Sequence, residues 1–189
     1  QANCTQPPLL PDEQLVQLTK YIALLGVRPQ RNAGDAEVTA GKQIFSDIGC
    51  ADCHTPQFVT SEFHPLAELR EQTIYPYTDL LVHDLGEGLA DGFSEGEATG
   101  REWRTSPLWG LGNQACVTGG VQGETGQVPF GTDGQEVCSP VHGYLHDGRA
   151  RTIEEAILWH GGEAVTSQEA FRQLGATSKA QLLAFLNSL

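Results

Sequence analysis

The motif Cys50-Ala51-Asp52-Cys53-His54 constrains this chain more than any other feature of its sequence. Two thiols three residues apart can reach the two vinyl groups of one porphyrin, and the adjacent histidine then lies under the iron, so C-x-x-C-H is the attachment signature of c-type haem. A thioredoxin-like dithiol needs a βαβ context, and a zinc site needs a second Cys or His pair at suitable spacing. Neither accompanies the motif. The sequence therefore predicts one covalent haem c on Cys50 and Cys53, with His54 as an iron ligand.

Few residues can serve as the second axial ligand of the iron, because haem c usually takes Met or His there and the chain contains no methionine. The position is either empty or filled by one of five histidines: His64, His83, His142, His146 or His160. His160 shares an apolar helical face with Ile153 and Ile157. We predict His160 as the iron ligand, with His146, ahead of an Asp-Gly turn, as the runner-up. The alternative for His160 is a core histidine whose ring is satisfied by a backbone carbonyl.

Arginines are the expected partners of buried haem propionates, which need positive or hydrogen-bonding groups. Four stand out in a chain poor in cations: Arg101, Arg104, Arg149 and Arg151. Arg104 is our choice because it precedes an apolar stretch, in which Pro107 and Leu108 are predicted to wall the porphyrin. An ordinary surface position for Arg104 is the competing interpretation.

The charge balance is strongly acidic, with 24 Asp and Glu against 11 Lys and Arg and a net charge of −13. This sign argues against nucleic acid as a partner. An acidic surface suits docking to a basic redox partner, but it also simply keeps a protein soluble. Calcium binding near the acidic turns at residues 87–97 stays open.

The cysteines and the apolar runs bear on the compartment. Apolar runs are only a few residues long, so no membrane span is expected. Cys116 and Cys138 flank a glycine-rich stretch, and a disulfide between them would be stable only in an oxidising compartment, which favours the periplasm or the cell exterior. Cys4 is then either a free thiol or paired outside this sequence. Residues 1–4 carry no signal-peptide features, so we expect any such peptide to be removed or to lie outside the sequence.

Helical patterns dominate the chain and predict a mainly α, cytochrome c-like domain with long loops. Apolar periodicity predicts helices over residues 12–26 and 37–48, the second running into the cysteine motif. Capping-box signatures at Thr152, Thr166 and Ser178 predict three more, the last with Leu182, Phe185, Leu186 and Leu189 on one face. Residues 55–113 are expected to form loops with short helices, and Gly119 to Gly134 an exposed insertion. We expect residues 1–35 to form a linking helix and arm, and residues 36–189 the cytochrome c domain.

Four stretches resemble the carboxy-terminal half of bacterial dihaem oxidoreductases, a family related to the dihaem cytochrome c peroxidases. They are GCADCHTP at 49–56, YTDLLVHDLG at 77–86, REWRTSPLWGLG at 101–112 and LHDGRARTIEEAILWHGG at 145–162. In the peroxidase relatives a distal Met ligand lies at about the position of His160, so the resemblance also implies that His160 binds iron. Such relatives have two haem domains, whereas this chain has one motif. The resemblance implies a second haem domain outside this sequence, or a separately encoded or single-haem descendant.

Three functions compete at this point. The first is electron transfer through a six-coordinate, low-spin haem with two histidine ligands. The second is a haem peroxidase or oxidase, as part of a dihaem enzyme. The third is a cytochrome subunit of a larger redox complex, with a redox protein or a second haem domain as the partner.

Overall fold

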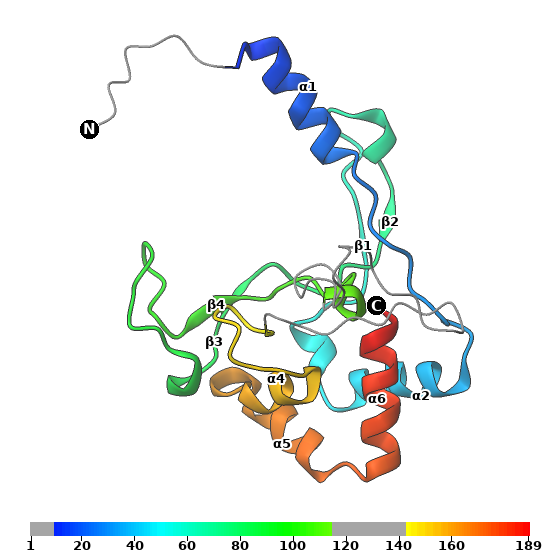
Figure 1. Cartoon of the computed structure of the whole chain (residues 1–189), viewed down its shortest axis with the longest axis vertical. Helices are drawn as coiled ribbons and strands as arrows, with labels where there is room; N and C mark the ends of the chain where they lie inside the picture. Colours follow the sequence, from blue (N-terminus) through cyan, green and yellow to red (C-terminus); the bar gives the residue numbers. More distant parts are fainter. Residues whose placement is uncertain (1–9, 115–142) are drawn as a thin grey trace, which may run out of the picture.

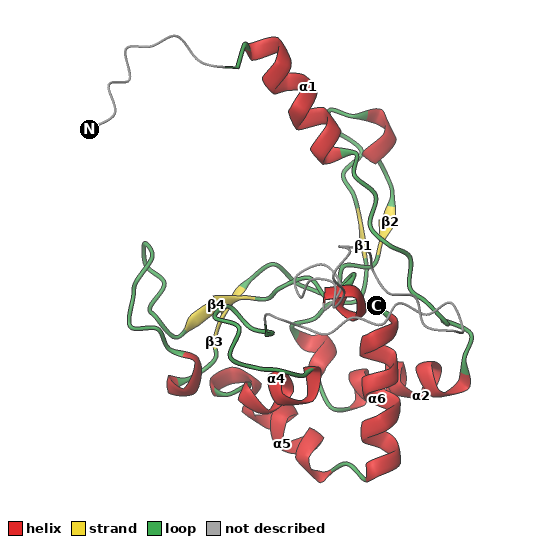
Figure 2. Cartoon of the chain, in the orientation of Figure 1, coloured by secondary structure: helices red, strands yellow, loops and turns green. Residues whose placement is uncertain are grey.

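A computed structural model describes residues 10–114 and 143–189 of the chain. The predictions on Cys4, Cys116, Cys138, His142 and the insertion from Gly119 to Gly134 lie outside the described residues. Within the described part, helices and turns predominate and the strands are two or three residues long (Figures 1 and 2). The prediction of a mainly α fold is confirmed.

Five α-helices occur in the described part: α1 (Asp12–Ala23), α2 (Ala36–Asp47), α4 (Ile153–Trp159), α5 (Val165–Gln173) and α6 (Ala176–Ser188). Short 3-10 helices are η1 (Cys50–Asp52), η2 (Ala67–Leu69), η3 (Glu87–Leu89), η4 (Leu111–Asn113) and η5 (Gly162–Ala164). Two antiparallel pairs of strands join β1 (Phe58–Val59) to β2 (Thr73–Ile74), and β3 (Val82–Asp84) to β4 (Glu102–Arg104). Helices therefore form the body, and the expected loops of residues 55–113 also hold these four strands.

The core lies where α2 packs against α6. Phe45 of α2 and Phe185 of α6 meet edge to face, with ring centroids 5.4 Å apart. Gly41 lets the two helices approach, because a Cβ at this position would overlap the backbone carbonyl of Gln181 and lie 2.8 Å from the Cβ of Phe185. All four residues predicted on one face of the last helix are buried: Leu182, Phe185, Leu186 and Leu189. The core therefore holds α2, and the cysteine turn that follows it, against the C-terminal helix.

Helix α1 stands away from this body (Figure 1) and buries none of its residues. It ends at Ala23, three residues before Gly26, and its apolar stripe of Leu15, Leu18 and Ile22 is 46–57% exposed. The predicted helix is therefore present, but its apolar face is not buried by any residue in the part of the chain that the structure describes. No helix in residues 10–114 or 143–189 combines the length and hydropathy needed to cross a bilayer.

Two helix starts differ from the capping signatures. Helix α5 begins at Val165, so Thr166 lies inside it, and α6 begins at Ala176, two residues before Ser178. Neither helix has a side-chain cap; Ala164 and Gly175 occupy the N-cap positions. The signatures at Thr166 and Ser178 were wrong as start points because side-chain capping is one of several ways to satisfy the first amide groups of a helix.

The capping box at Thr152 is half right. Thr152 is the N-cap of α4, and its hydroxyl accepts from the Glu155 amide at 3.0 Å. The Glu155 carboxylate accepts from the amide of Arg151 at 2.9 Å, one residue before the expected donor. The helix therefore starts where the sequence predicts, with a displaced second hydrogen bond.

Candidate functional site

The cysteine motif forms a tight turn directly after α2. The helix is capped at Ile48, and Gly49 adopts a left-handed conformation with φ of 83°, which glycine tolerates without strain. Cys50 then opens η1, and its carbonyl accepts from the His54 amide at 3.0 Å. Cys50 and Cys53 are half-buried and not disulfide-bonded. Both thiols are therefore held on one short turn, close to the histidine that follows them.

Burial raises the pKa of both thiols. The pKa of Cys50 rises to about 11, chiefly through burial. Burial also raises the pKa of Cys53, with smaller contributions from Asp79 and Glu163. Catalytic and redox-active cysteines normally have lowered pKa values, because the thiolate is the reactive form. The environment of the pair therefore disfavours the dithiol alternative.

His54 lies against the aromatic core. Its ring centroid is 6.2 Å from that of Phe45, and Phe45 in turn contacts Tyr77 and Phe185. The Nδ1 of His54 lies 3.0 Å from the carbonyl oxygen of Tyr77. A carbonyl can only accept, so Nδ1 carries the proton and donates it. In the neutral ring the free lone pair is then on Nε2, the arrangement common among metal-binding histidines.

The ring of His160 lies next to that of His54. His160 was predicted to lie on the helix, but it follows the last residue of α4. Helix α4 ends at Trp159, and His160 is the C-cap with φ of −62° and ψ of 129°. Its Nδ1 donates to the carbonyl of Ala156 at 2.8 Å. The ring centroids of His54 and His160 are 6.5 Å apart, at an interplanar angle of 52°. Two imidazoles, each with Nδ1 fixed by a backbone carbonyl, therefore lie side by side in the interior.

Both rings are held in the neutral form. Burial lowers the pKa of His54 to about 4, against a smaller opposing effect of its bond to Tyr77. Burial likewise lowers the pKa of His160, opposed by its bond to Ala156. Metal ions bind imidazole in its neutral form, which is the form that the lowered pKa values favour for both side chains.

The other described histidines are engaged elsewhere. The two ring nitrogens of His83 meet carboxylates, Asp79 at 2.8 Å and Glu163 at 3.0 Å. His146 stacks on Trp103 with centroids 3.6 Å apart and an angle of 13°. His64 accepts from the amide of Leu66 at 3.1 Å. Of the described candidates for a second ligand, His160 is the one whose ring contacts that of His54.

A cluster that sequence reasoning missed lies beside Cys53. The Sγ of Cys53, a carboxylate oxygen of Asp79 and a ring nitrogen of His83 are all within 4.8 Å of one another. Such a set could hold a metal ion, so the structure supplies partners for the zinc alternative that the sequence lacked. The three residues are 26 and 4 positions apart, and no motif links them. In the described part of the chain, no comparable group gathers at the acidic turns of residues 87–97.

The predicted propionate site is spread over β4 and the loop after it. Arg104 is exposed and pairs with Val82 across the strands. Pro107 and Leu108 are half-buried, and Leu108 packs against the core. Arg149, a candidate not chosen, binds the carboxylate of Asp147 at 2.6 Å. Its guanidinium lies 4.9 Å from the ring centre of Trp159, the neighbour of His160.

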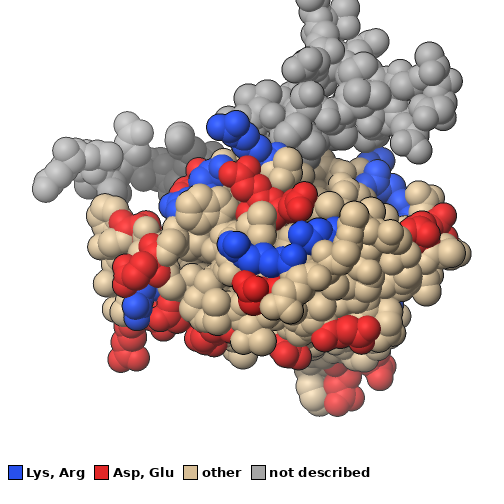
Figure 3. Space-filling model, turned by 90° about the horizontal axis from the view of Figure 1, so that it is seen from below, with Lys and Arg blue, Asp and Glu red and all other residues tan. Residues whose placement is uncertain are grey.

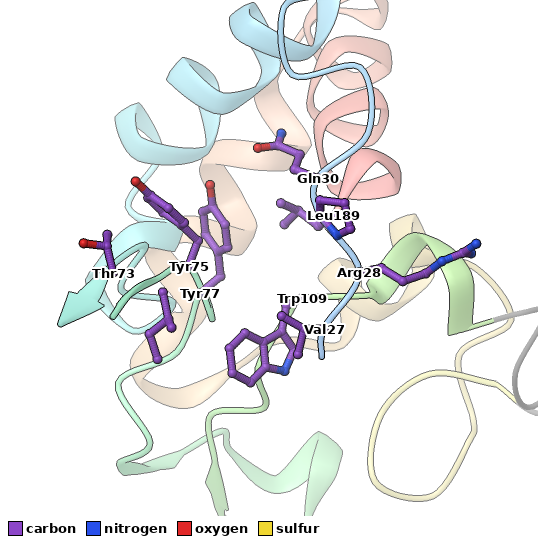
Figure 4. A pocket seen from close by; sticks show the side chains of 10 residues that line it. Val27, Arg28, Gln30, Thr73, Tyr75, Tyr77, Trp109 and Leu189 are labelled. Carbon is purple, nitrogen blue, oxygen red and sulfur yellow. The ribbon is translucent and has the colours of Figure 1, made fainter. Parts of the chain in front are cut away.

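Tyr77 also lines an apolar cavity of about 200 Å³ (Figure 4). Tyr75, Tyr77 and Trp109 surround it, together with Val27 of the arm after α1 and the C-terminal Leu189. Tyr77 thus lines this cavity while its backbone carbonyl fixes His54.

The paired charges of His83 predict a pH-dependent stability. Hydrogen bonds to Glu163 and Asp79 raise the pKa of His83 above its usual value. Because the pKa of His83 is higher in the folded than in the unfolded protein, protonated His83 stabilises the fold. This contribution is complete below the unfolded pKa of about 6.5, and it is lost as the pH rises through the pKa of the folded protein. The free energies of unfolding of wild type and His83→Gln should therefore differ most below about pH 6 and converge at higher pH. A difference that stays constant from pH 6 to pH 9 would contradict this assignment.

Taken together, the fold and the site define a class: a helical domain that presents a C-x-x-C-H turn, with the imidazole of its histidine close to a second imidazole. A family model described as "Di-haem oxidoreductase, putative peroxidase" matches residues 12–189, and the chain belongs to this di-haem oxidoreductase family. The resemblance seen in the sequence is thereby confirmed, and with it a haem redox role. No match was found among curated proteins or among solved structures.

Proposed function

We propose that this chain holds one haem c through thioether bonds to Cys50 and Cys53, with His54 and His160 as the two iron ligands, and that it transfers single electrons. The observation that carries the proposal is the pairing of the two rings, 6.5 Å apart and both bound at Nδ1 to backbone carbonyls. When bound, haem supplies an iron that cycles between its ferric and ferrous forms.

The spacing of the rings supports this ligation. Two imidazoles that would hold one metal ion through Nε2, with bonds of about 2 Å, can have ring centroids up to roughly 6.5 Å apart. The separation of 6.5 Å falls in this range. No thioether side chain competes, since the chain contains no methionine.

The chain's own residues have three tasks in this proposal. The carbonyls of Tyr77 and Ala156 orient the ligand rings, and the Phe45 cluster excludes water from the His54 side. Two histidine ligands leave no position on the iron for a substrate and give a lower reduction potential than His with Met. Arg104 is proposed to bind a propionate, and Pro107 and Leu108 to wall the porphyrin. These tasks suit electron transfer.

Peroxidase or oxidase activity is the second candidate, and the family description favours it. It would require a vacant iron position, in this chain or on another haem that this chain serves. Rapid cyanide binding by the isolated ferric protein, or a spectral change with hydrogen peroxide, would support the catalytic version. Inertness to both reagents supports pure electron transfer.

A second haem domain is the partner we propose, as part of the same protein or of a larger redox complex. The family is di-haem, whereas this chain carries one C-x-x-C-H motif. The exposed stripe of α1 gives such a domain an apolar surface, consistent with residues 1–35 acting as a link to the haem domain of residues 36–189. On the face shown in Figure 3, acidic side chains are scattered among a few basic ones, so charge alone does not mark a docking site there.

Haem counting tests this partner. The assembly purified from its native host should contain two haems for each copy of this chain, measured as pyridine haemochrome against protein. One haem per chain would contradict it. Periplasmic or extracellular location is part of the same proposal, and fractionation of the host cells tests it.

Covalent attachment is tested on denaturing gels stained for haem. Wild type should retain its pigment, and the double variant Cys50→Ser, Cys53→Ser should lose it. Wild-type protein that releases all its haem, or that contains zinc in place of iron, would refute the proposed cofactor.

A further inference from the structure

One short segment, residues 77–84, contacts the surroundings of both imidazoles. At its start, the carbonyl of Tyr77 accepts from His54 at 3.0 Å. At its end, the ring of His83 and the amide of Asp84 each lie 3.0 Å from the carboxylate of Glu163. Glu163 follows His160 by three residues. The segment is therefore hydrogen-bonded to His54 at one end and, at the other, to Glu163, which lies three residues after His160.

The 77–84 segment has a fixed backbone. Tyr77 and Leu80 adopt left-handed φ angles of 53° and 62°, which non-glycine residues hold only when their surroundings fix them. The buried hydroxyl of Thr78 donates to the Thr105 carbonyl at 2.6 Å and accepts from the Leu80 amide at 2.9 Å. The Thr78 amide donates to the carbonyl of Thr55 at 3.1 Å. Hydrogen bonds therefore hold the backbone of the segment between its two ends.

The chain after His160 lies tightly against the far end of this segment. Gly162 adopts a left-handed φ of 52°, and a Cβ there would overlap the Asp84 carbonyl. A Cβ on Gly161 would lie 2.9 Å from the Leu85 carbonyl. These glycines allow Glu163 to reach His83 and Asp84. They are also the two residues that connect His160 to Glu163 in the chain.

Charged side chains also link the 77–84 segment to the residues after His160. His83 donates from both ring nitrogens, to Asp79 at 2.8 Å and to Glu163 at 3.0 Å, so the ring is a cation between two anions. Other charged groups nearby are Asp84 and Glu87, which both pair with Arg101. The His83 and Glu163 pair is thus the charged link between the 77–84 segment and the residues that follow His160.

We propose that Glu163 and His83 are positioning residues that set the spacing between the rings of His54 and His160 and so keep His160 on the iron. This inference rests on the proposed function, in which His160 is an iron ligand. Neither Glu163 nor His83 touches the iron; they act through the backbone of residues 160–163.

Two variants of Glu163 test the proposal in the haem-loaded protein. Glu163→Gln retains an oxygen for the Asp84 amide but loses the charge, and Glu163→Ala loses both contacts. The control is Glu87→Gln, the same charge change at a side chain 82% exposed, which pairs with Arg101 and not with His83. We expect the cyanide association rate to rise about threefold in Glu163→Gln and about tenfold in Glu163→Ala, because cyanide enters when His160 is off the iron. The high-spin fraction of the ferric spectrum should rise in the same order, and added imidazole should reverse it.

Each outcome separates the inference from the proposed function. A wild-type ferric spectrum that is already high-spin overturns the ligation by His160. A low-spin wild type, with rates and spectra unchanged in both Glu163 variants, overturns only the positioning role. Equal changes in Glu87→Gln also overturn it, because they would show a general effect of surface charge. If Glu163→Ala does not fold, Glu163→Gln decides by the same readouts.

Discussion

Replacing His160 by methionine should convert the ferric haem from two imidazole ligands to one imidazole and one thioether, and raise its reduction potential by on the order of 0.1 V. The reason is that a second imidazole favours ferric iron more than a thioether does. His160 is the described histidine beside His54, with ring centroids 6.5 Å apart, so its replacement changes the coordination directly. The potential is measured by spectroelectrochemical titration, and the thioether is recognised by its charge-transfer band to ferric iron.

The matched control is His146→Met, because His146 was the runner-up ligand in the sequence. In the structure its ring stacks on Trp103 and not on His54. This variant should leave the potential and the spectrum unchanged. If the potential shifts in His146→Met and stays constant in His160→Met, the ligand has been assigned to the wrong histidine.

Replacing Gly41 by alanine should destabilise the fold by about 3 kcal/mol or more. The added methyl group would overlap the Gln181 carbonyl and approach the Cβ of Phe185, where both neighbours belong to the packed helix α6. To relieve the overlap α2 must move away from α6, which disturbs the cysteine turn at the end of α2. Denaturant unfolding, followed by fluorescence and haem absorbance, measures the loss.

Gly34→Ala is the control for this prediction, since no atom lies within 4 Å of a Cβ at Gly34. Its free energy of unfolding should stay within about 0.5 kcal/mol of wild type. Equal stability of the two variants would show that α2 and α6 do not cross as closely as described.

Local sequence signals predicted the parts of the fold that depend on nearby residues. The cysteine motif placed its turn at a helix end, and the spacing of Leu182, Phe185, Leu186 and Leu189 gave the buried face of α6. The second helix was found with nearly correct bounds. The close packing of this helix against α6 was not predicted, because the need for glycine at position 41 arises from Gln181, 140 residues later.

Beyond the cysteine motif, the candidate site was predictable where the sequence lacks one residue type. With no methionine in the chain, the apolar spacing pointed to His160, and the structure brings its ring to His54. The helix was expected to include His160, yet it ends one residue earlier, where the ring can donate to Ala156. The contact of His83 and Asp79 with each other and with Glu163 gave no signal, because Glu163 lies 80 positions after His83 and no motif links the two segments. The exposed stripe of α1 followed a valid helical pattern, but a pattern alone does not say which partner covers it.

Whether one iron is held by both His54 and His160 can be read from the magnetic and optical spectrum of the purified ferric protein. We expect the low-spin signal of a haem with two imidazole ligands, without a thioether charge-transfer band. A high-spin ferric spectrum, or the absence of iron from the protein, would contradict it.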